Sequence, residues 1–274
     1  MDFCERIMII DFHTHIFPDK IAAKTIASLS SAANITSATD GTLHGLLESM
    51  NQSGVDLSVI QPVMTKPEQF ESVNRFARSI NEKFEGRLLS FGGIHPDCED
   101  YKQKLNQIKE LGLPGIKIHP DYQNVMIDDV RFMNIIEYAD ELGLIILTHS
   151  GIDIGLPDPV HCPPDKVRRV LDKLKPKKLV LAHYGAWKQW EAVYEYLAGE
   201  NVYLDTAFTF EYIEQDLFLK ILQKHSRDKI LFATDSPWSD AAEGIKALNH
   251  FPLSQNIKDD ILGNNATKLL QMKE

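Results

Sequence analysis

The sequence predicts a (β/α)8 barrel, the α/β fold also called a TIM barrel, and three observations support this. Eight short runs rich in Ile, Leu and Val each precede a polar turn and a segment with helical spacing. These runs are almost continuously apolar, as expected for parallel strands that are covered on both faces. The chain has 274 residues, and about 250 residues is typical of this barrel.

The strands and helices can be placed in chain order. A helix over 43–52 ends at Gly54, and the helix over 128–142 has acidic residues in its first turn and Gly143 as its stop. The expected strands are 8–16, 55–63, 88–95, 115–119, 144–149, 178–183, 201–206 and 229–235. The other expected helices are 20–31, 67–84, 99–111, 164–174, 186–197, 211–225, 241–249 and 257–272, and 34–41 is expected to be a loop.

The chain shows no sign of a domain boundary. It has no Pro- or Ser-rich linker, no charge block and no low-complexity tract, so we expect a single TIM-barrel domain over 1–274. A doubly wound open sheet is the structural alternative. It is disfavoured because no Gly-x-Gly-x-x-Gly follows a strand and opens a helix.

Charge and composition restrict the partners. The net charge of -10 disfavours nucleic acid, because nucleic-acid binders usually present a basic face. The three cysteines, Cys4, Cys98 and Cys162, fit reduced thiols better than a disulfide framework. Residues 1–6 show no signal-peptide pattern, and no run approaches the roughly 18 apolar residues of a membrane span. We therefore expect a cytoplasmic protein that does not bind membranes and acts on a small molecule, with a homo-oligomer left open.

The first strand ends in two histidines separated by one residue, in the stretch Asp-Phe-His-Thr-His. Side chains at i and i+2 of a strand point to the same side, so His13 and His15 can present both imidazoles to one point. Two polar residues facing water at a strand end would be the simpler interpretation of this pair alone. Later strand ends argue against it, because they also carry residues that can bind a metal or move a proton.

In a barrel of this kind, function lies at the carboxyl ends of the strands. Six of the ten histidines lie at predicted strand ends, whereas His44, His161, His225 and His250 fall in helices or loops and are expected to be surface or capping residues. The side chains expected at the strand ends are His13, His15, His95, Lys117, His119, His149, His183 and Asp235.

These residue types suit a metal site. Zinc binds imidazole nitrogens and carboxylate oxygens, and a catalytic site keeps one position open for water or substrate. Metal-bound water has a pKa of about 7, which supplies hydroxide at neutral pH. His13, His15 and His149 can be nitrogen ligands, and Asp235 can contact the metal and take a proton from its water. His183 is then left as a general acid or base, or as a group that polarises the substrate.

Five motifs together resemble the amidohydrolase superfamily, in particular the amidohydrolase-related group that includes aminocarboxymuconate-semialdehyde decarboxylase. They are Asp-Phe-His-Thr-His at 11–15, Thr-His-Ser-Gly at 148–151, Leu-Ala-His-Tyr-Gly at 181–185, Ala-Thr-Asp-Ser-Pro-Trp at 233–238 and Gly-Asn-Asn-Ala-Thr-Lys-Leu-Leu at 263–270. The resemblance covers the whole chain. It implies one divalent ion, usually zinc, on His13, His15, His149 and Asp235, with His183 acting on substrate or binding a second metal.

The end of the fourth strand departs from part of that superfamily. Two-metal members place a carboxylated lysine or a glutamate there, and this chain offers Lys117 and His119. Lys117 can be an ammonium that binds a substrate carboxylate, which we favour, a carboxylated bridge between two metals, or a lysine buried in an ion pair. We expect His119 to contact substrate, and for His95 substrate contact and simple packing are equally supported.

The leading expectation is a metal-dependent hydrolase acting on a small amide, ester or lactone that carries a carboxylate. Asp235 would accept the proton of the metal-bound water, and His183 with Lys117 would polarise or anchor the substrate. The alternative is a non-oxidative decarboxylase (a carboxy-lyase) that uses the same site. A metabolite-binding barrel without catalysis and a phosphodiesterase are disfavoured, the first because His183 and Asp235 are both present.

Overall fold

The computed structural model describes residues 6–272, and its strands form a parallel α/β barrel. The strand order follows the chain in two runs, β1-β2-β3 and β4-β5-β6-β7-β8-β9, and every pair is parallel. The strands are β1 Ile10–Thr14, β2 Leu57–Ile60, β3 Leu88–Ser90, β4 Gly92–Gly93, β5 Gly115–Ile118, β6 Ile145–Thr148, β7 Leu179–Leu181, β8 Tyr203–Asp205 and β9 Ile230–Leu231.

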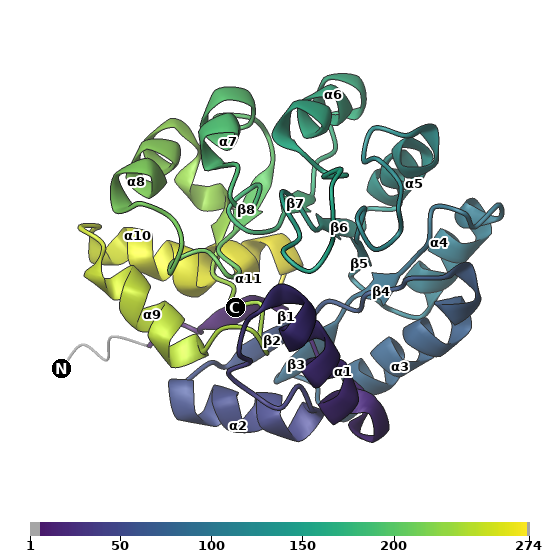
Figure 1. Cartoon of the computed structure of the whole chain (residues 1–274), viewed down its shortest axis with the longest axis horizontal. Helices are drawn as coiled ribbons and strands as arrows, with labels where there is room; N and C mark the ends of the chain where they lie inside the picture. Colours follow the sequence, from purple (N-terminus) through teal and green to yellow (C-terminus); the bar gives the residue numbers. More distant parts are fainter. Residues whose placement is uncertain (1–5, 273–274) are drawn as a thin grey trace.

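Backbone hydrogen bonds join the two runs into a ring (Figure 1). Only Phe91 separates β3 from β4, so the expected third strand is one barrel strand with an interruption, and the Phe91 N–H donates to Ile60. At the other junction the Phe12 N–H donates to Phe232, and the Asp235 N–H donates to the His13 carbonyl over 2.8 Å. The predicted TIM-barrel fold class is confirmed.

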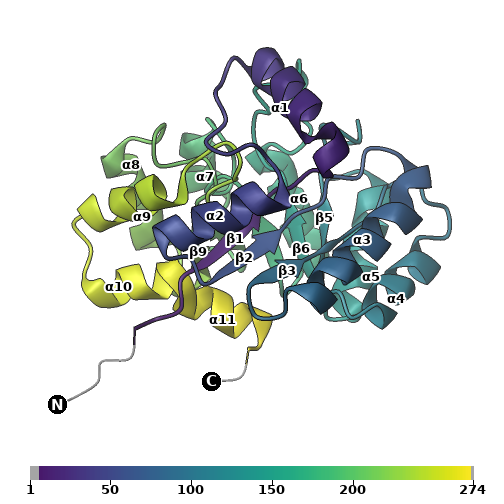
Figure 2. The same ribbon diagram turned by 90° about the horizontal axis from the view of Figure 1, so that it is seen from below.

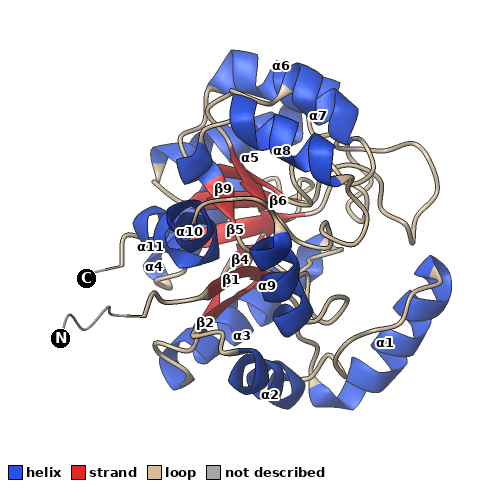
Figure 3. Ribbon diagram, turned by 90° about the vertical axis from the view of Figure 1, so that its left-hand side faces the viewer, coloured by secondary structure: helices blue, strands red, loops and turns tan. Residues whose placement is uncertain are grey.

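Helices surround the strands (Figures 1 and 3). The expected last helix is divided by a π-helical turn, η3, where the backbone packs so closely that a Cβ on Gly263 would lie 1.7 Å from the Met8 carbonyl oxygen. The helical elements are α1 Asp19–Ala33, α2 Leu43–Ser53, η1 Pro67–Gln69, α3 Phe70–Lys83, α4 Tyr101–Glu110, α5 Val130–Glu141, α6 Pro164–Leu174, α7 Trp190–Tyr196, α8 Gln215–Lys224, η2 Arg227–Lys229, α9 Ala241–His250, α10 Gln255–Asp259, η3 Asp260–Asn264 and α11 Asn265–Leu270.

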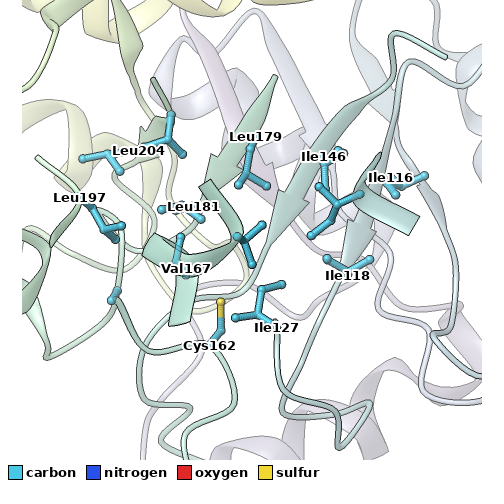
Figure 4. Packing of buried hydrophobic residues seen from close by; sticks show 14 of the residues in the cluster. Ile116, Ile118, Ile127, Ile146, Cys162, Val167, Leu179, Leu181, Leu197 and Leu204 are labelled. Atoms are coloured by element: carbon cyan, nitrogen blue, oxygen red, sulfur yellow. The ribbon is translucent and has the colours of Figure 1, made fainter. Parts of the chain in front are cut away.

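The apolar core has two layers, which follow from the alternation of side chains along each strand. Ile145 and Leu147 belong to a cluster that fills the barrel interior, together with Val180 of β7. Ile146, between them, packs in the outer cluster between strands and helices. Figure 4 shows this outer layer, where Leu179 and Leu181 lie near Val167 of α6.

One helix stands apart from this arrangement. Figures 2 and 3 show α1 beyond the end of the barrel that lies opposite α10 and α11. Ala22 is the buried residue of α1. The loop that follows returns to the barrel: the Phe17 N–H donates to Gly41, and the Ala38 N–H donates to Pro237. Gly41 has a φ of 71°, and a Cβ there would lie 2.7 Å from Ile26 of α1, so this glycine permits the close approach.

The other sequence expectations concern thiols and membranes. Cys98 and Cys162 are buried free thiols, and Cys4 lies outside the described residues. Within residues 6–272, none of the helices has both the length and the apolar character that a membrane crossing requires.

Candidate metal centre

A cavity of about 760 Å³ opens at the carboxyl ends of the strands. Seven of the eight side chains expected at strand ends line it: His13, His15, Lys117, His119, His149, His183 and Asp235. We call these seven residues the polar cluster. His95 is the exception, because it does not line this cavity and its Nδ1 accepts the N–H of Asp97 in the following turn. The structure therefore does not bring His95 to the substrate position considered for it.

The irregular end of β1 turns its two histidines into the cavity. Ile10 and Phe12 point into the barrel interior, and the pairing of β1 with β2 shifts between Asp11 and Thr14. Asp11 holds this end in place by accepting the backbone N–H and the hydroxyl of Thr234. Burial raises the pKa of the Asp11 carboxyl to about 7, against the effect of these hydrogen bonds.

His13, His15 and Asp235 form one of two groups among the described residues that could hold a metal ion. The two histidine Nε2 atoms are 3.1 Å apart, and Asp235 Oδ1 lies 3.1 Å from His15 Nε2 and 3.4 Å from His13 Nε2. The outer nitrogens are fixed: His13 Nδ1 contacts Asp205 over 2.9 Å, and His15 Nδ1 contacts the Gln61 carbonyl over 2.7 Å. A carbonyl oxygen only accepts, so His15 Nδ1 carries a proton.

This donor set fits a divalent cation. With its proton at Nδ1, the neutral form of the His15 ring would present a lone pair at Nε2 to a carboxylate oxygen 3.1 Å away. Two acceptors at this separation repel each other unless a proton or a cation lies between them. A metal ion with two imidazoles and a carboxylate satisfies all three atoms at once, and fixing the outer nitrogen of each histidine is the usual support of such ligands.

The fourth expected ligand, His149, falls in a second group with His119 and Asp153 instead of the first. Its ring stacks on His119 with centroids 4.3 Å apart, and its Nδ1 lies 3.0 Å from His183 Nε2. The other nitrogen, Nε2, is buried without a hydrogen-bond partner among the described residues, and Asp121 Oδ2 is 3.9 Å away. Three of the four expected ligands therefore share one group and His149 lies in the other, and its role as a metal ligand stays a prediction.

His183 faces the cavity through a local change of chain direction. It lies two residues after the end of β7 and has a φ of 60°, in the left-handed region, where Tyr184 also lies. Its Nδ1 donates to the Ala207 carbonyl over 2.9 Å, which leaves Nε2 as the nitrogen that contacts His149. Ala182 points into the barrel interior. The strained backbone that follows it lets the next side chain, His183, reach the cavity.

Asp205 is a site residue that the sequence analysis did not single out. It ends β8, is fully buried, and contacts His13 Nδ1 through Oδ2 while Oδ1 accepts the N–H groups of His183 and Ala207. Burial raises its pKa to about 6, although His183, Lys117 and the two N–H donors favour the charged form. A signal was available, because Asp205 lies one residue before the end of the predicted strand 201–206, and other predicted strands also end in acids or histidines.

Lys117 lies within the polar cluster, almost fully buried, with Nζ 3.0 Å from His13 Nε2. Burial lowers its pKa to about 8, against the attraction of Asp205 and Asp235. Among the described residues no carboxylate lies within ion-pair distance of Nζ, so the interpretation as a lysine buried in an ion pair is wrong. An ammonium and a carboxylated lysine both remain compatible with the position of Lys117 beside His13.

Burial also sets the charge of the histidines. It holds the pKa values of His13, His119 and His149 well below their usual range, and the nearby cationic groups act in the same direction. For Asp235, burial raises the pKa, but the hydrogen bond with His15 and the charges of His183, His15 and Lys117 outweigh it and the net shift is downward. Neutral imidazoles beside an ionised carboxylate are the protonation states that metal ligands require.

Comparisons with known proteins identify the family and similar folds. The model of the amidohydrolase family matches residues 10–272. A 5-carboxyvanillate decarboxylase from Sphingomonas paucimobilis superposes with a TM-score of 0.71 and 14% identity over 98% of this chain and 100% of that one. A dihydroxybenzoic acid decarboxylase from Polaromonas, with bound manganese and the inhibitor 2-nitroresorcinol, gives 0.73 and 15% over 98% of each chain.

A third solved structure, an uncharacterized TIM-barrel protein from Bordetella bronchiseptica, gives a TM-score of 0.78 at 17% identity and covers 97% of this chain and 99% of that one. Among curated proteins, no sequence matches this chain significantly. At these identities the likeness to solved structures shows the fold, and the family match rests on the sequence.

Proposed function

The chain belongs to the amidohydrolase family, and from that premise we propose that it is a metal-dependent, non-oxidative decarboxylase of a small carboxylic acid. This was the alternative in the sequence analysis, where hydrolysis of an amide, ester or lactone led. Two of the similar solved structures are decarboxylases, which supports the alternative. Decarboxylation also suits the cavity described above.

The observation that carries the proposal is the contrast inside the cavity. Neutral imidazoles, Lys117 and Asp235 gather at one end, and most other lining side chains are apolar. A carboxylate held there gives up its hydration for contact with a few fixed groups. Loss of hydration disfavours the charged carboxylate more than neutral carbon dioxide, so such surroundings favour loss of the carboxyl group.

His13, His15 and Asp235 would hold the metal, with His149 and His183 on the adjacent wall. When bound, a divalent ion would supply a Lewis acid that polarises a substrate oxygen. Zinc is the ion that the motifs imply, and manganese is bound in the Polaromonas structure. Both ions are therefore to be loaded separately before assay.

The proton balance of the reaction assigns a task to the remaining groups. The substrate carbon gains one proton and loses the carboxyl group as carbon dioxide, so each turnover consumes one proton. We assign its delivery to Asp235, which faces the cavity and, because it rests ionised, first takes up that proton from solvent water; His183 is the second proton-transfer group. Lys117 anchors the substrate carboxylate, and His119 contacts the substrate from the wall that carries His149.

The test compares two reactions on metal-loaded protein. A panel of hydroxybenzoic acids, with and without an apolar ring substituent and labelled with ¹³C at the carboxyl group, is assayed for labelled carbon dioxide. A matched panel of carboxylate-bearing lactones and amides is assayed for ring or amide opening. In D₂O the product of decarboxylation must carry one deuterium at the carbon that lost the carboxyl group. Opening of lactones or amides without carbon dioxide release from any acid would restore hydrolysis as the function.

A further inference from the structure

The outer half of the cavity is lined by apolar, partly exposed side chains, in contrast to the buried polar cluster. Helix α1 contributes Ile21, Thr25, Leu29 and Ala33 to its lining. These positions are four residues apart, so they form one stripe on the helix surface. None of the four is buried, and Ile21 is 49% exposed. The stripe of α1 therefore faces the open cavity and does not pack into the core.

The opposite side of the outer cavity is also apolar. Val73 and Phe76 of α3 line it, and Phe76 is 39% exposed. The buried face of α3 is formed by other residues, Phe70, Asn74, Ala77 and Ile80. We call Ile21, Leu29, Val73 and Phe76 the apolar wall. Two of its residues come from α1 and two from α3, and both pairs line the same cavity.

From this geometry we propose that the substrate is a carboxylic acid with an extended apolar body, larger than a single ring, which occupies the space between α1 and α3. The inference rests on the proposed function, because the polar cluster must hold the carboxylate. A cavity of about 760 Å³ is in the upper part of the roughly 300–1,000 Å³ range of sites that enclose drug-sized ligands. The apolar wall is continuous with the polar cluster in this one cavity, which defines both the occupant and its orientation.

The position of α1 is built into the fold. Gly41 allows the loop after α1 to pack against Ile26, and the Ala38 N–H donates to Pro237, two residues after Asp235. The helix is thereby tied to the same strand end that carries part of the polar cluster. Its exposed apolar stripe costs free energy in water, and an apolar ligand body removes that cost.

The experiment measures binding, not turnover, and uses straight-chain hydroxamic acids on the metal-loaded protein. Acetohydroxamic, hexanohydroxamic and decanohydroxamic acid share one metal-binding head and differ only in the chain. Trp187 and Trp238 line the cavity, so tryptophan fluorescence can follow each titration. At ~0.8 kcal/mol per buried methylene, affinity should rise about three- to four-fold for each of the first several methylenes.

A matched pair of variants tests whether the alkyl chain of the ligand lies against α1. Leu29→Ser should lower the affinity for decanohydroxamic acid about three- to ten-fold and leave that for acetohydroxamic acid within about two-fold. Ala27→Ser, at an exposed position two residues away on the other side of α1, carries the same new side chain and should leave both affinities unchanged.

The outcomes separate the two proposals. Equal affinity for all three acids would overturn the extended apolar substrate and leave the metal centre intact. No binding of any hydroxamate would contradict the metal centre and with it this inference. Light scattering on both variants adds a further outcome: if wild type and Ala27→Ser are dimers, Leu29→Ser is a monomer and chain length has no effect, a second copy covers α1 and the inference is wrong.

Discussion

The two ends of the cavity differ in how firmly their side chains are held. In the polar cluster almost every side chain is buried and fixed by another group, as His13 is by Asp205 and His15 by the Gln61 carbonyl. In the apolar wall, Ile21 and Phe76 remain partly exposed and come from helices that line the mouth. The difference assigns the reaction to strand ends, where positions are rigid, and the choice of substrate to helices, where side chains can change without disturbing the barrel.

The largest expected effect lies in the polar cluster. Asp235→Asn keeps nearly the same shape but removes the carboxylate charge and its capacity to transfer a proton. Turnover of metal-saturated protein should fall by about 10² to 10⁴, while metal affinity should fall by only about one to two orders of magnitude.

Turnover and metal content are therefore measured on the same Asp235→Asn sample, with His183→Asn as a second proton-transfer variant. Near wild-type turnover of metal-saturated Asp235→Asn would show that Asp235 does not deliver the proton. His183 would then become the leading candidate.

A smaller effect on metal binding is expected from Asp205, which contacts His13. Asp205→Asn removes the carboxylate that fixes His13 Nδ1 and should weaken metal affinity about 10- to 100-fold. Competition with a coloured chelator measures this affinity. Asp172→Asn, which changes an exposed acid on α6 that pairs with Arg168, is the control. Equal metal affinity in the two variants would remove Asp205 from its positioning role.

Substitutions in the apolar wall should change substrate binding and leave the rate of the chemical step unchanged. Phe76→Ala shortens a side chain that lines the outer cavity, so KM for the best substrate of the labelled panel should rise about three- to ten-fold. Its kcat should stay within about two-fold, since the polar cluster is unchanged. Arg75→Ala, at the neighbouring exposed position, provides the baseline. A fall in kcat equal to the rise in KM would mean that the two ends of the cavity are not independent.

The smallest effect concerns stability. Ile21→Ser, at a position that is 49% exposed, should change the free energy of unfolding by no more than about 0.5 kcal/mol. Ile146→Ala, fully buried between strands and helices, should cost about 2–5 kcal/mol. Urea denaturation measures both. A large loss for Ile21→Ser would mean that α1 supports the barrel and does not merely line the cavity.

The contrast also explains what the sequence could predict. Apolar runs and helical spacing identified the barrel, and the strand ends identified the seven residues of the polar cluster, because a strand end has a fixed direction in this fold. The third strand divides at Phe91, and the last helix divides at η3, where close packing against Met8 determines the backbone. Such contacts between distant segments leave no periodic pattern.

Residue roles were harder to predict than residue positions. His95 ends a predicted strand but turns to the Asp97 N–H, because a local turn decides where its ring faces. The role of His149 as a metal ligand stays a prediction. Asp205 was visible at a strand end and was overlooked. The apolar wall could not be predicted, since nothing in residues 19–33 indicates which face of the helix meets α3 across a cavity.

The central claim is that the polar cluster holds a divalent metal. Elemental analysis of purified protein, compared with His13→Ala under the same conditions, tests it most directly, with circular dichroism to confirm that the variant is folded. We expect about one divalent ion per wild-type chain and a large loss of metal in His13→Ala. Full metal occupancy in folded His13→Ala, or a wild-type protein that binds neither zinc nor manganese when dialysed against them, would contradict it.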